Sequence, residues 1–133
     1  MTTDIYPSMR YHDALAAIDW LERAFGLERH LVYEGAGGRV DHAELRYGDG
    51  LIMLGTVRGD DDPRLPGQGW AYVVVGDIHA HHERANAAGA EIVEAPQVLD
   101  YGSFYSARDL EGNLWSFGTY RPAPPTRSPA SGD

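Results

Sequence analysis

The sequence predicts an α+β fold made of two copies of one βαβββ unit. In each half of the chain a strand-like segment is followed by a helix-like segment and three more strand-like segments. An aspartate precedes each helix-like segment and a glycine follows it, as is typical of helix ends. Matching residues recur 62 to 64 positions apart, in the pairs Asp13 and Asp77, Gly26 and Gly89, Glu28 and Glu91, and Arg46 and Arg108. A repeat of this length indicates two copies of one supersecondary unit packed together.

The first unit is expected over about residues 5–56 and begins with a short apolar-rich strand over 5–11. Asp13 then precedes a segment, 14–25, whose apolar residues recur at helical spacing. An aspartate at this place can accept a hydrogen bond from a free N–H group of the first helical turn, and Gly26 supplies the usual stop. We therefore expect a strand followed by an amphipathic helix.

Three strands complete the first unit, over 29–33, 40–46 and 51–55. A glycine-rich turn, 35–38, joins the first two, and the Tyr-Gly-Asp-Gly segment 47–50 predicts a hairpin turn between the last two. Apolar and polar residues alternate through 40–46, which is typical of a strand with one buried face.

A linker over 57–69 separates the units, and its prolines, glycines and three consecutive aspartates predict an exposed connector with a solvated acidic run. The second unit, about 70–120, repeats the first. Its expected elements are a strand over 70–75, a helix from Asp77 through 88, and strands over 91–98, 103–108 and 113–120. The Pro- and Ser-rich tail 121–133 is expected to be flexible.

Size and composition favour a single domain, residues 1–133, because 133 residues cannot supply two independent cores. The chain has 43% apolar residues and no cysteine, so we expect a cytoplasmic protein without disulfides. No apolar run is long enough for a membrane span. The net charge of −9 disfavours nucleic acid, whose phosphates it would repel.

The two βαβββ units, the Tyr101-Gly102 pair and the closing run Asp-Leu-Glu-Gly-Asn-Leu-Trp over 109–115 resemble the vicinal oxygen chelate superfamily. This superfamily includes glyoxalase I, fosfomycin-resistance enzymes, extradiol dioxygenases and bleomycin-resistance proteins. The resemblance implies a half-open, U-shaped β-sheet barrel with flanking helices and a small-molecule ligand on its concave face. It also implies a homodimer, in which units from two chains sometimes share a groove.

The resemblance also identifies where metal-dependent members place their ligands. In this chain those places hold Tyr6, Met53, Trp70 and Ser116, none of which is a usual ligand of a divalent metal. We therefore expect no metal site and no cofactor.

Strand alternation extends this set of groove residues, because residues i and i+2 share one face of a strand. If Tyr6 and Trp70 face the groove, so do Arg10 and Tyr72. In 40–46 the apolar residues belong to the helix side, which leaves His42 and Glu44 on the groove side. The ligand-binding residues that we predict are Tyr6, Arg10, His42, Glu44, Met53, Trp70, Tyr72, Tyr101, Phe104 and Ser116. Alternatively, some of these rings fill the barrel or a subunit interface.

His42 and Glu44 are the pair best suited to proton chemistry, since a carboxylate beside an imidazole favours the protonated ring. They are the catalytic candidates, although a structural hydrogen-bonded pair explains them equally well. A second group, His79, His81 and His82, is interpreted as the polar outer face of the second helix rather than as a metal site.

Three functions follow from these patterns. The favoured one is a metal-independent small-molecule binding protein of the glyoxalase/bleomycin-resistance type, whose aromatic groove holds a flat or aromatic ligand. Negative net charge and Glu44 add a preference for a cationic ligand. The alternative is a metal-dependent lyase, isomerase or dioxygenase that uses His42, Glu44 and a further donor. The third is a scaffold whose groove is filled by its own side chains.

Overall fold

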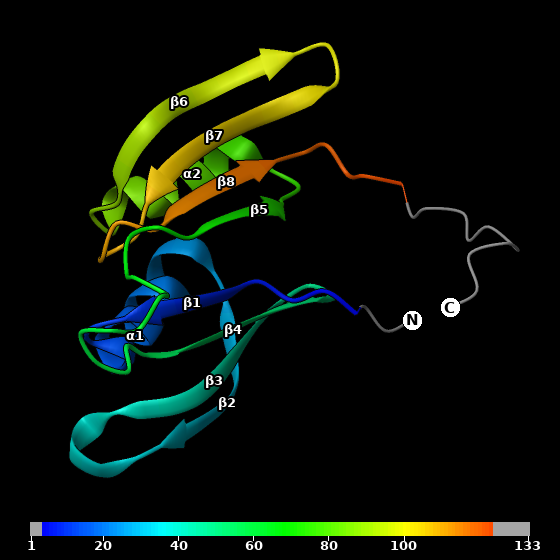
Figure 1. Cartoon of the computed structure of the whole chain (residues 1–133). Helices are drawn as coiled ribbons and strands as arrows, with labels where there is room; N and C mark the ends of the chain where they lie inside the picture. Colours follow the sequence, from blue (N-terminus) through cyan, green and yellow to red (C-terminus); the bar gives the residue numbers. More distant parts are fainter. Residues whose placement is uncertain (1–3, 124–133) are drawn as a thin grey trace, which may run out of the picture.

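The computed structural model describes residues 4–123, which form two βαβββ units (Figure 1). The first contains β1 (Ser8–Tyr11), α1 (Ala14–Phe25), β2 (Glu28–Glu34), the short 3₁₀ helix η1 (Ala36–Gly38), β3 (Val40–Tyr47) and β4 (Gly50–Thr56). The second contains β5 (Trp70–Val74), α2 (Ile78–Ala87), β6 (Glu91–Leu99), β7 (Gly102–Arg108) and β8 (Leu114–Gly118). The predicted α+β fold is confirmed. Of the tail predicted over 121–133, residues 124–133 lie outside the described part.

Each unit forms its own four-stranded sheet, in the orders β1-β4-β3-β2 and β5-β8-β7-β6. The first strand of each unit pairs in parallel with the last strand, and the other neighbours are antiparallel. The same topology therefore appears twice. In the described residues no strand pairing joins the two sheets, so they remain open rather than closing into a barrel.

Both helices begin at the predicted aspartates. The Asp13 side chain accepts a hydrogen bond from the Ala16 amide at 3.1 Å, and Asp77 does the same for Ala80 at 3.0 Å. At the other end of α1, Gly26 adopts φ 80°, a left-handed conformation that glycine takes without a steric penalty. Local sequence therefore determines these helix boundaries.

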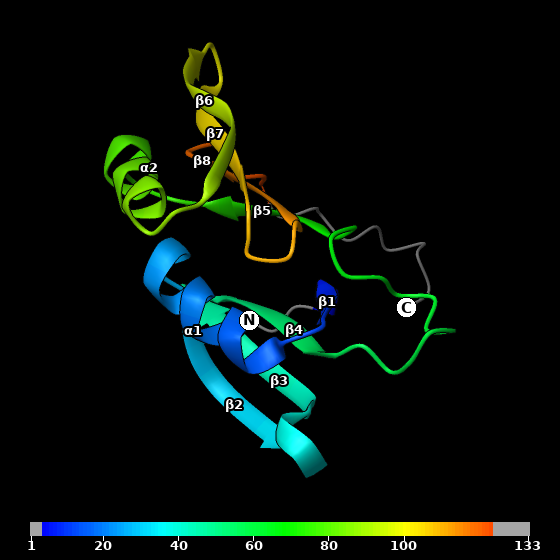
Figure 2. The same ribbon diagram turned by 90° about the vertical axis from the view of Figure 1, so that its left-hand side faces the viewer.

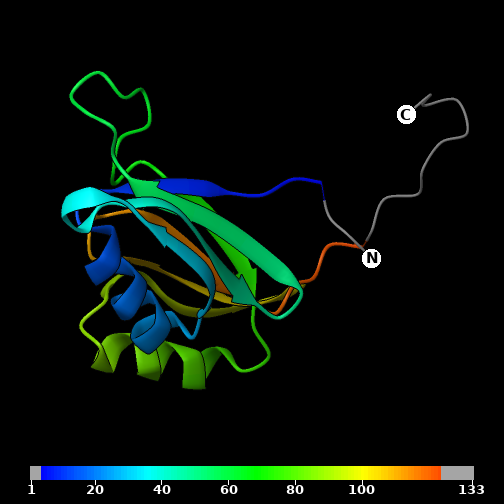
Figure 3. The same ribbon diagram turned by 90° about the horizontal axis from the view of Figure 1, so that it is seen from below.

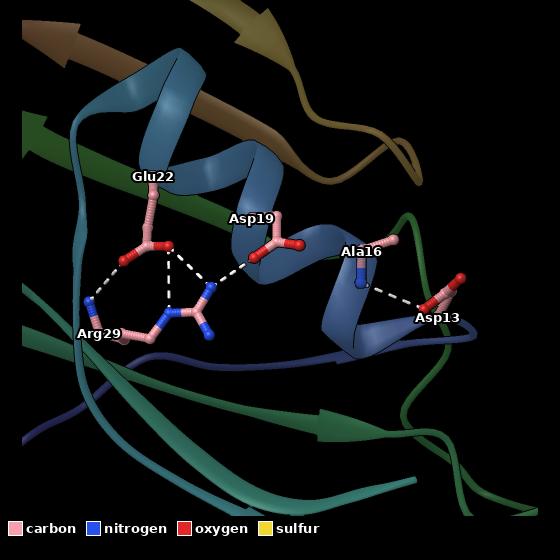
Figure 4. A network of polar contacts seen from close by, with 5 residues as sticks. All are labelled: Asp13, Ala16, Asp19, Glu22 and Arg29. Atoms are coloured by element: carbon pink, nitrogen blue, oxygen red, sulfur yellow. Dashed lines mark hydrogen bonds and ion pairs between the residues drawn. The ribbon is translucent and has the colours of Figure 1, made fainter. Parts of the chain in front are cut away.

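An ion network joins the outer face of α1 to the start of β2 (Figure 4). Arg29 Nη2 lies 2.8 Å from Glu22 Oε1 and also bonds Asp19. The hydrogen bond with Glu22 is the main cause of the raised pKa of Arg29, and the same side-chain contact is the main cause of the lowered pKa of Glu22. All three side chains remain accessible to water, so the network contributes little to stability.

The hydrophobic core lies between the sheets and the two helices, which pack side by side (Figure 3). Figure 2 shows the same arrangement from the side, with α1 and α2 covering neighbouring parts of the two sheets. Core residues come from both units, with Phe25, Leu45 and Leu54 from the first and Tyr105, Trp115 and Phe117 from the second fully buried. Neither unit buries its apolar face alone. None of the described helices is both long and apolar enough to cross a membrane.

The Asp-Leu-Glu-Gly-Asn turn before β8 joins the two units. Asp109 Oδ2 accepts hydrogen bonds from the Tyr11 hydroxyl of unit one at 2.6 Å and from Trp115 Nε1 at 3.0 Å. Its other oxygen accepts the amides of Glu111 and Asn113 at 3.0 Å each. Burial and the Asp109 charge raise the pKa of Tyr11 well above its ordinary value. The motif that carries the family resemblance is therefore a structural clamp.

Two sequence interpretations were wrong. His81 is only 9% exposed, because its ring turns into the core: Nε2 donates to the Phe25 carbonyl at 2.8 Å, and Nδ1 accepts from the Tyr105 hydroxyl at 2.5 Å. The third aspartate of the linker, Asp62, is also buried rather than solvated, since the loop folds around its carboxylate.

Candidate ligand-binding site

The concave face of the second sheet carries a row of side chains that reaches across all four strands. Strand register places Tyr72 beside Ser116, Ser116 beside Ser106, and Ser106 beside Glu94. Residues between these positions, such as Ala71 and Phe117, point into the core. The pleat of the sheet therefore separates a groove side from a core side, as alternation predicts.

A pocket of about 240 Å³ opens on this row. Its aromatic walls come from β5, from the β6–β7 hairpin and from the segment after β8. The lining residues are Trp70, Tyr72, Glu94, Tyr101, Gly102, Ser103, Phe104, Ser116 and Tyr120. Five of the ten predicted ligand-binding residues thus meet in one pocket.

Hydrogen bonds hold two of the rings in place. Trp70 Nε1 donates to Ser116 Oγ at 3.0 Å, and Ser116 Oγ lies 2.9 Å from Ser106 Oγ. The Tyr72 hydroxyl donates to the Tyr120 carbonyl at 2.6 Å, and desolvation is the main cause of its raised pKa. A side chain at Gly118 would lie within 2.9 Å of the Tyr72 ring, so glycine is needed beneath it. The walls are therefore positioned before any ligand enters.

Glu94 is the only charged residue in this lining, and no arginine or lysine among the described residues contributes to it. Glu94, Ser103 and Tyr120 also line the pocket and were not among the predicted residues. Glu94 could have been found from pairing, because it lies opposite Ser106, which the repeat spacing places on the groove side. That pairing depends on a register shift in β6, which alternation alone does not reveal.

The concave face of the first sheet is charged instead. His42 Nε2 lies 2.8 Å from Glu44 Oε2, and the His42 ring stacks on Tyr33 at a centroid distance of 6.4 Å. Met53 lies beside Glu44 on the neighbouring strand, while Arg10 projects over Gly55. Tyr6 precedes β1 and, like these four predicted residues, is absent from the lining of the aromatic pocket.

The residues that the resemblance places at metal positions do not fit a metal centre. Trp70 and Ser116 are hydrogen-bonded to each other, an indole N–H has no lone pair to offer, and Met53 brings a weak thioether. Within residues 4–123, no three His, Asp or Glu side chains come close enough together to hold an ion. His42 and Glu44 together supply two donors where a catalytic metal needs at least three.

A larger cleft of about 450 Å³ lies between the two units. Its lining is largely apolar and includes the core residues Leu45, Ile52, Ala71 and Trp115. It brings together few polar side chains that could orient a ligand, whereas small-molecule sites combine apolar walls with such groups. The aromatic pocket is therefore the stronger candidate.

Comparison with known proteins agrees with this fold. The profile of the Glyoxalase/Bleomycin resistance protein/Dioxygenase superfamily matches residues 6–117. TioX from Micromonospora sp. ML1 shares 32% sequence identity and a TM-score of 0.75, with 90% of this chain and 100% of that chain covered.

Two further similarities are more distant. Lactoylglutathione lyase from Agrobacterium tumefaciens has a TM-score of 0.65 at 20% identity, covering 89% of this chain and 93% of that one, which shows a shared fold alone. An uncharacterized protein of Mycobacterium bovis is 29% identical over 135 residues, which span 89% of this chain and 86% of that protein.

Proposed function

The chain belongs to the glyoxalase/bleomycin resistance protein/dioxygenase superfamily, and we propose that it binds a flat, aromatic small molecule in the pocket of its second unit without the help of a metal. The supporting observation is the set of five aromatic side chains around one small opening: Trp70, Tyr72, Tyr101, Phe104 and Tyr120. Rings give a large contact area at a small cost in side-chain entropy, and they stack on flat ligands.

Charge favours a cationic ligand. Glu94 supplies a carboxylate at the edge of the pocket, and the faces of the aromatic rings attract positive charge. Glu94 thus supplies the negative charge that was expected from Glu44 and that favours a cationic ligand. An anionic aromatic ligand of the same shape would meet repulsion from Glu94.

A homodimer would complete the pocket. The volume of the pocket in one chain, about 240 Å³, is smaller than the roughly 300 Å³ of the smallest usual small-molecule sites. Trp70 and Tyr101, at 70% and 68% exposure, leave its outer side open to water. A unit from a second chain placed over this face would bury both rings and enclose the ligand.

The test is a titration with three tricyclic aromatic probes in buffer containing EDTA: acridine orange as the cation, acridone as the neutral ring system and anthraquinone-2-sulfonate as the anion. Saturable binding of the cation, with weaker binding of the anion, is expected by calorimetry. Replacing Trp70 with Ala should weaken the binding of acridine orange about 30-fold, since loss of a central aromatic contact costs about 2 kcal/mol.

Leu110→Ala is the matched control, because Leu110 is apolar and exposed but lies outside the pocket. It should leave the affinity unchanged. Equal losses in both variants, or binding that disappears only when EDTA is present, would overturn the proposal.

The 2.8 Å contact between His42 and Glu44 favours one second candidate, a metal-dependent lyase, isomerase or dioxygenase that gains its third donor from elsewhere. Elemental analysis of protein purified without chelators distinguishes the metal-dependent enzyme from the metal-independent binding protein. Stoichiometric metal that is lost in His42→Ala would support the enzyme, while protein that takes up no metal on reconstitution would leave ligand binding as the better account.

A further inference from the structure

Four arginines gather where the linker passes the end of the first sheet, in a chain whose net charge is −9. Arg10 lies on β1, Arg39 precedes β3, and Arg58 and Arg64 belong to the linker, which Figure 3 shows in green looping out beside β1. Arg39 Nη1 reaches the carbonyl of Val57, next to Arg58, at 3.4 Å. These four residues form what we call the arginine cluster.

Arg10 at its centre is largely buried, and one of its nitrogens has no partner among the described residues. Its side chain is 11% exposed, and its Nε is enclosed with no hydrogen-bond acceptor among the described residues. The carboxylate oxygen Asp62 Oδ2 lies 3.9 Å away, which is too far for a hydrogen bond. Buried donors in native proteins almost always have a partner, so Arg10 Nε is an exception.

Asp62 cannot supply that partner because its oxygens are already engaged. Oδ1 accepts the amide and Nε of Arg64 at 2.9 and 2.8 Å, and Oδ2 accepts the Arg58 amide at 2.9 Å. These bonds lower the pKa of Asp62, so it is ionised. Of the four guanidinium groups, only that of Arg64 is hydrogen-bonded to Asp62 within residues 4–123, and that of Arg10 lies 3.9 Å away. The neighbouring Asp60 and Asp61 are exposed and form no ion pair within residues 4–123.

Backbone geometry keeps room for the Arg10 guanidinium. A side chain at Gly55 would begin 2.6 Å from Arg10 Nη1, so the glycine leaves space for the guanidinium group beside β4. The positive charges of Arg58, Arg64 and Arg39 also act on Arg10 and, after desolvation, lower its pKa. An anion placed beside these guanidinium groups would relieve their mutual repulsion.

We propose that the arginine cluster is an anion site, separate from the aromatic pocket, which binds the carboxylate or phosphate group of a small molecule. Arg10 would act as the central ligand, and Arg58 and Arg64 would contact the anion from the linker side. A planar guanidinium presents paired donors that match the oxygens of either group.

The experiment follows the Arg10 Nε–Hε signal by NMR during titration with inorganic phosphate or malonate at constant ionic strength, with chloride as the reference salt. Saturation by at least one of the two probes in the low millimolar range is expected. Phosphate alone would identify a phosphate-bearing ligand, and malonate alone a carboxylate-bearing one. If neither probe shifts the signal more than chloride does, the proposal is overturned.

Variants of the arginines provide a second test, in which calorimetry measures the affinity for whichever of phosphate or malonate binds. Arg58→Gln and Arg64→Gln, at exposed positions, should each weaken it about threefold to tenfold, as expected for loss of one charged contact. Arg46→Gln removes the same charge from β3 outside the cluster and should leave affinity unchanged, as should Trp70→Ala, which disables only the aromatic pocket. Equal affinity in all four variants would contradict the assignment even if Arg10 variants fail to fold.

Discussion

The concave faces of the two units have the same backbone and opposite chemistry. In unit one the face carries Arg10 and the His42–Glu44 pair, and in unit two it carries Trp70 and Tyr72 around a pocket. Each first strand runs parallel to the last strand of its unit, with Gly55 in one and Gly118 in the other beneath a large side chain. The comparison shows that a duplicated scaffold fixes the positions of side chains, while the residues at those positions determine the chemistry.

The largest expected effect comes from breaking the clamp that both faces share. Asp109→Ala removes the acceptor for Tyr11 and Trp115 and for two backbone amides, which leaves buried donors unsatisfied. We expect a loss of about 3 kcal/mol or more in unfolding free energy, measured by urea denaturation. Asp109→Asn keeps one carbonyl acceptor and should lose less. A folded Asp109→Ala variant with unchanged stability would show that the two units are held by packing alone.

A matched pair of glycine variants tests whether the faces act independently. Gly118→Ala forces the Tyr72 ring to move, so binding of acridine orange should weaken. The overpacking itself should cost about 1 to 3 kcal/mol in folding stability. Gly55→Ala crowds Arg10 instead and should leave this affinity unchanged. If the two variants weaken dye binding equally, as measured by calorimetry, both faces contribute to one site.

The core beneath the faces should respond to pH through His81. Burial lowers the pKa of His81 from its ordinary 6.5, so the unfolded chain binds a proton before the folded chain does. The contribution of the neutral ring to stability is therefore complete above about pH 6.5 and declines as pH falls through this value, by at most about 1.4 kcal/mol per pH unit.

Urea denaturation between pH 5 and 7.5 measures how the free energy of unfolding changes with pH. His81→Gln should flatten it, whereas His79→Gln, at an exposed position on the same helix, should not. Identical slopes in the wild-type protein and His81→Gln would show that other groups control the acid sensitivity.

The smallest expected effect concerns the serine pair that orders the aromatic face of unit two. Ser116→Ala removes the partner of Trp70 Nε1 and of the buried Ser106 hydroxyl, and should cost about 1 kcal/mol in stability. Ser8→Ala, at an exposed position on the face of unit one, should cost almost nothing. Thermal denaturation of the two variants provides the measurement, and an equal shift would mean that the serine pair does not order the pocket.

Much of the fold could be predicted because its signals are local. Asp13 and Asp77 cap their helices as expected, Gly26 ends the first helix, and the hairpin before β4 lies where glycine and aspartate indicated it. Capping and turn formation depend on a few neighbouring residues, so they can be read from short segments. Strand ends were less certain, and β1 begins at Ser8 rather than at residue 5.

The site could be predicted only in part. Alternation brought Trp70, Tyr72 and Ser116 to one face, since the period of a strand is fixed. It could not find Glu94, whose side depends on a register shift in β6, nor separate Arg10 and His42 from the aromatic pocket. Those outcomes depend on how strands of different units curve and pair.

The sequence by itself determined the repeat, the order of helices and strands, and which side of β5 and β8 faces the groove, because each follows from spacing along the chain. The tertiary structure alone decided that His81 and Asp62 are buried, that Asp109 joins the two units, and that Arg10 lies within the influence of three other arginines. These are contacts between segments far apart in the sequence or folded around one loop. Their energies come from burial and partner geometry, which no local pattern encodes.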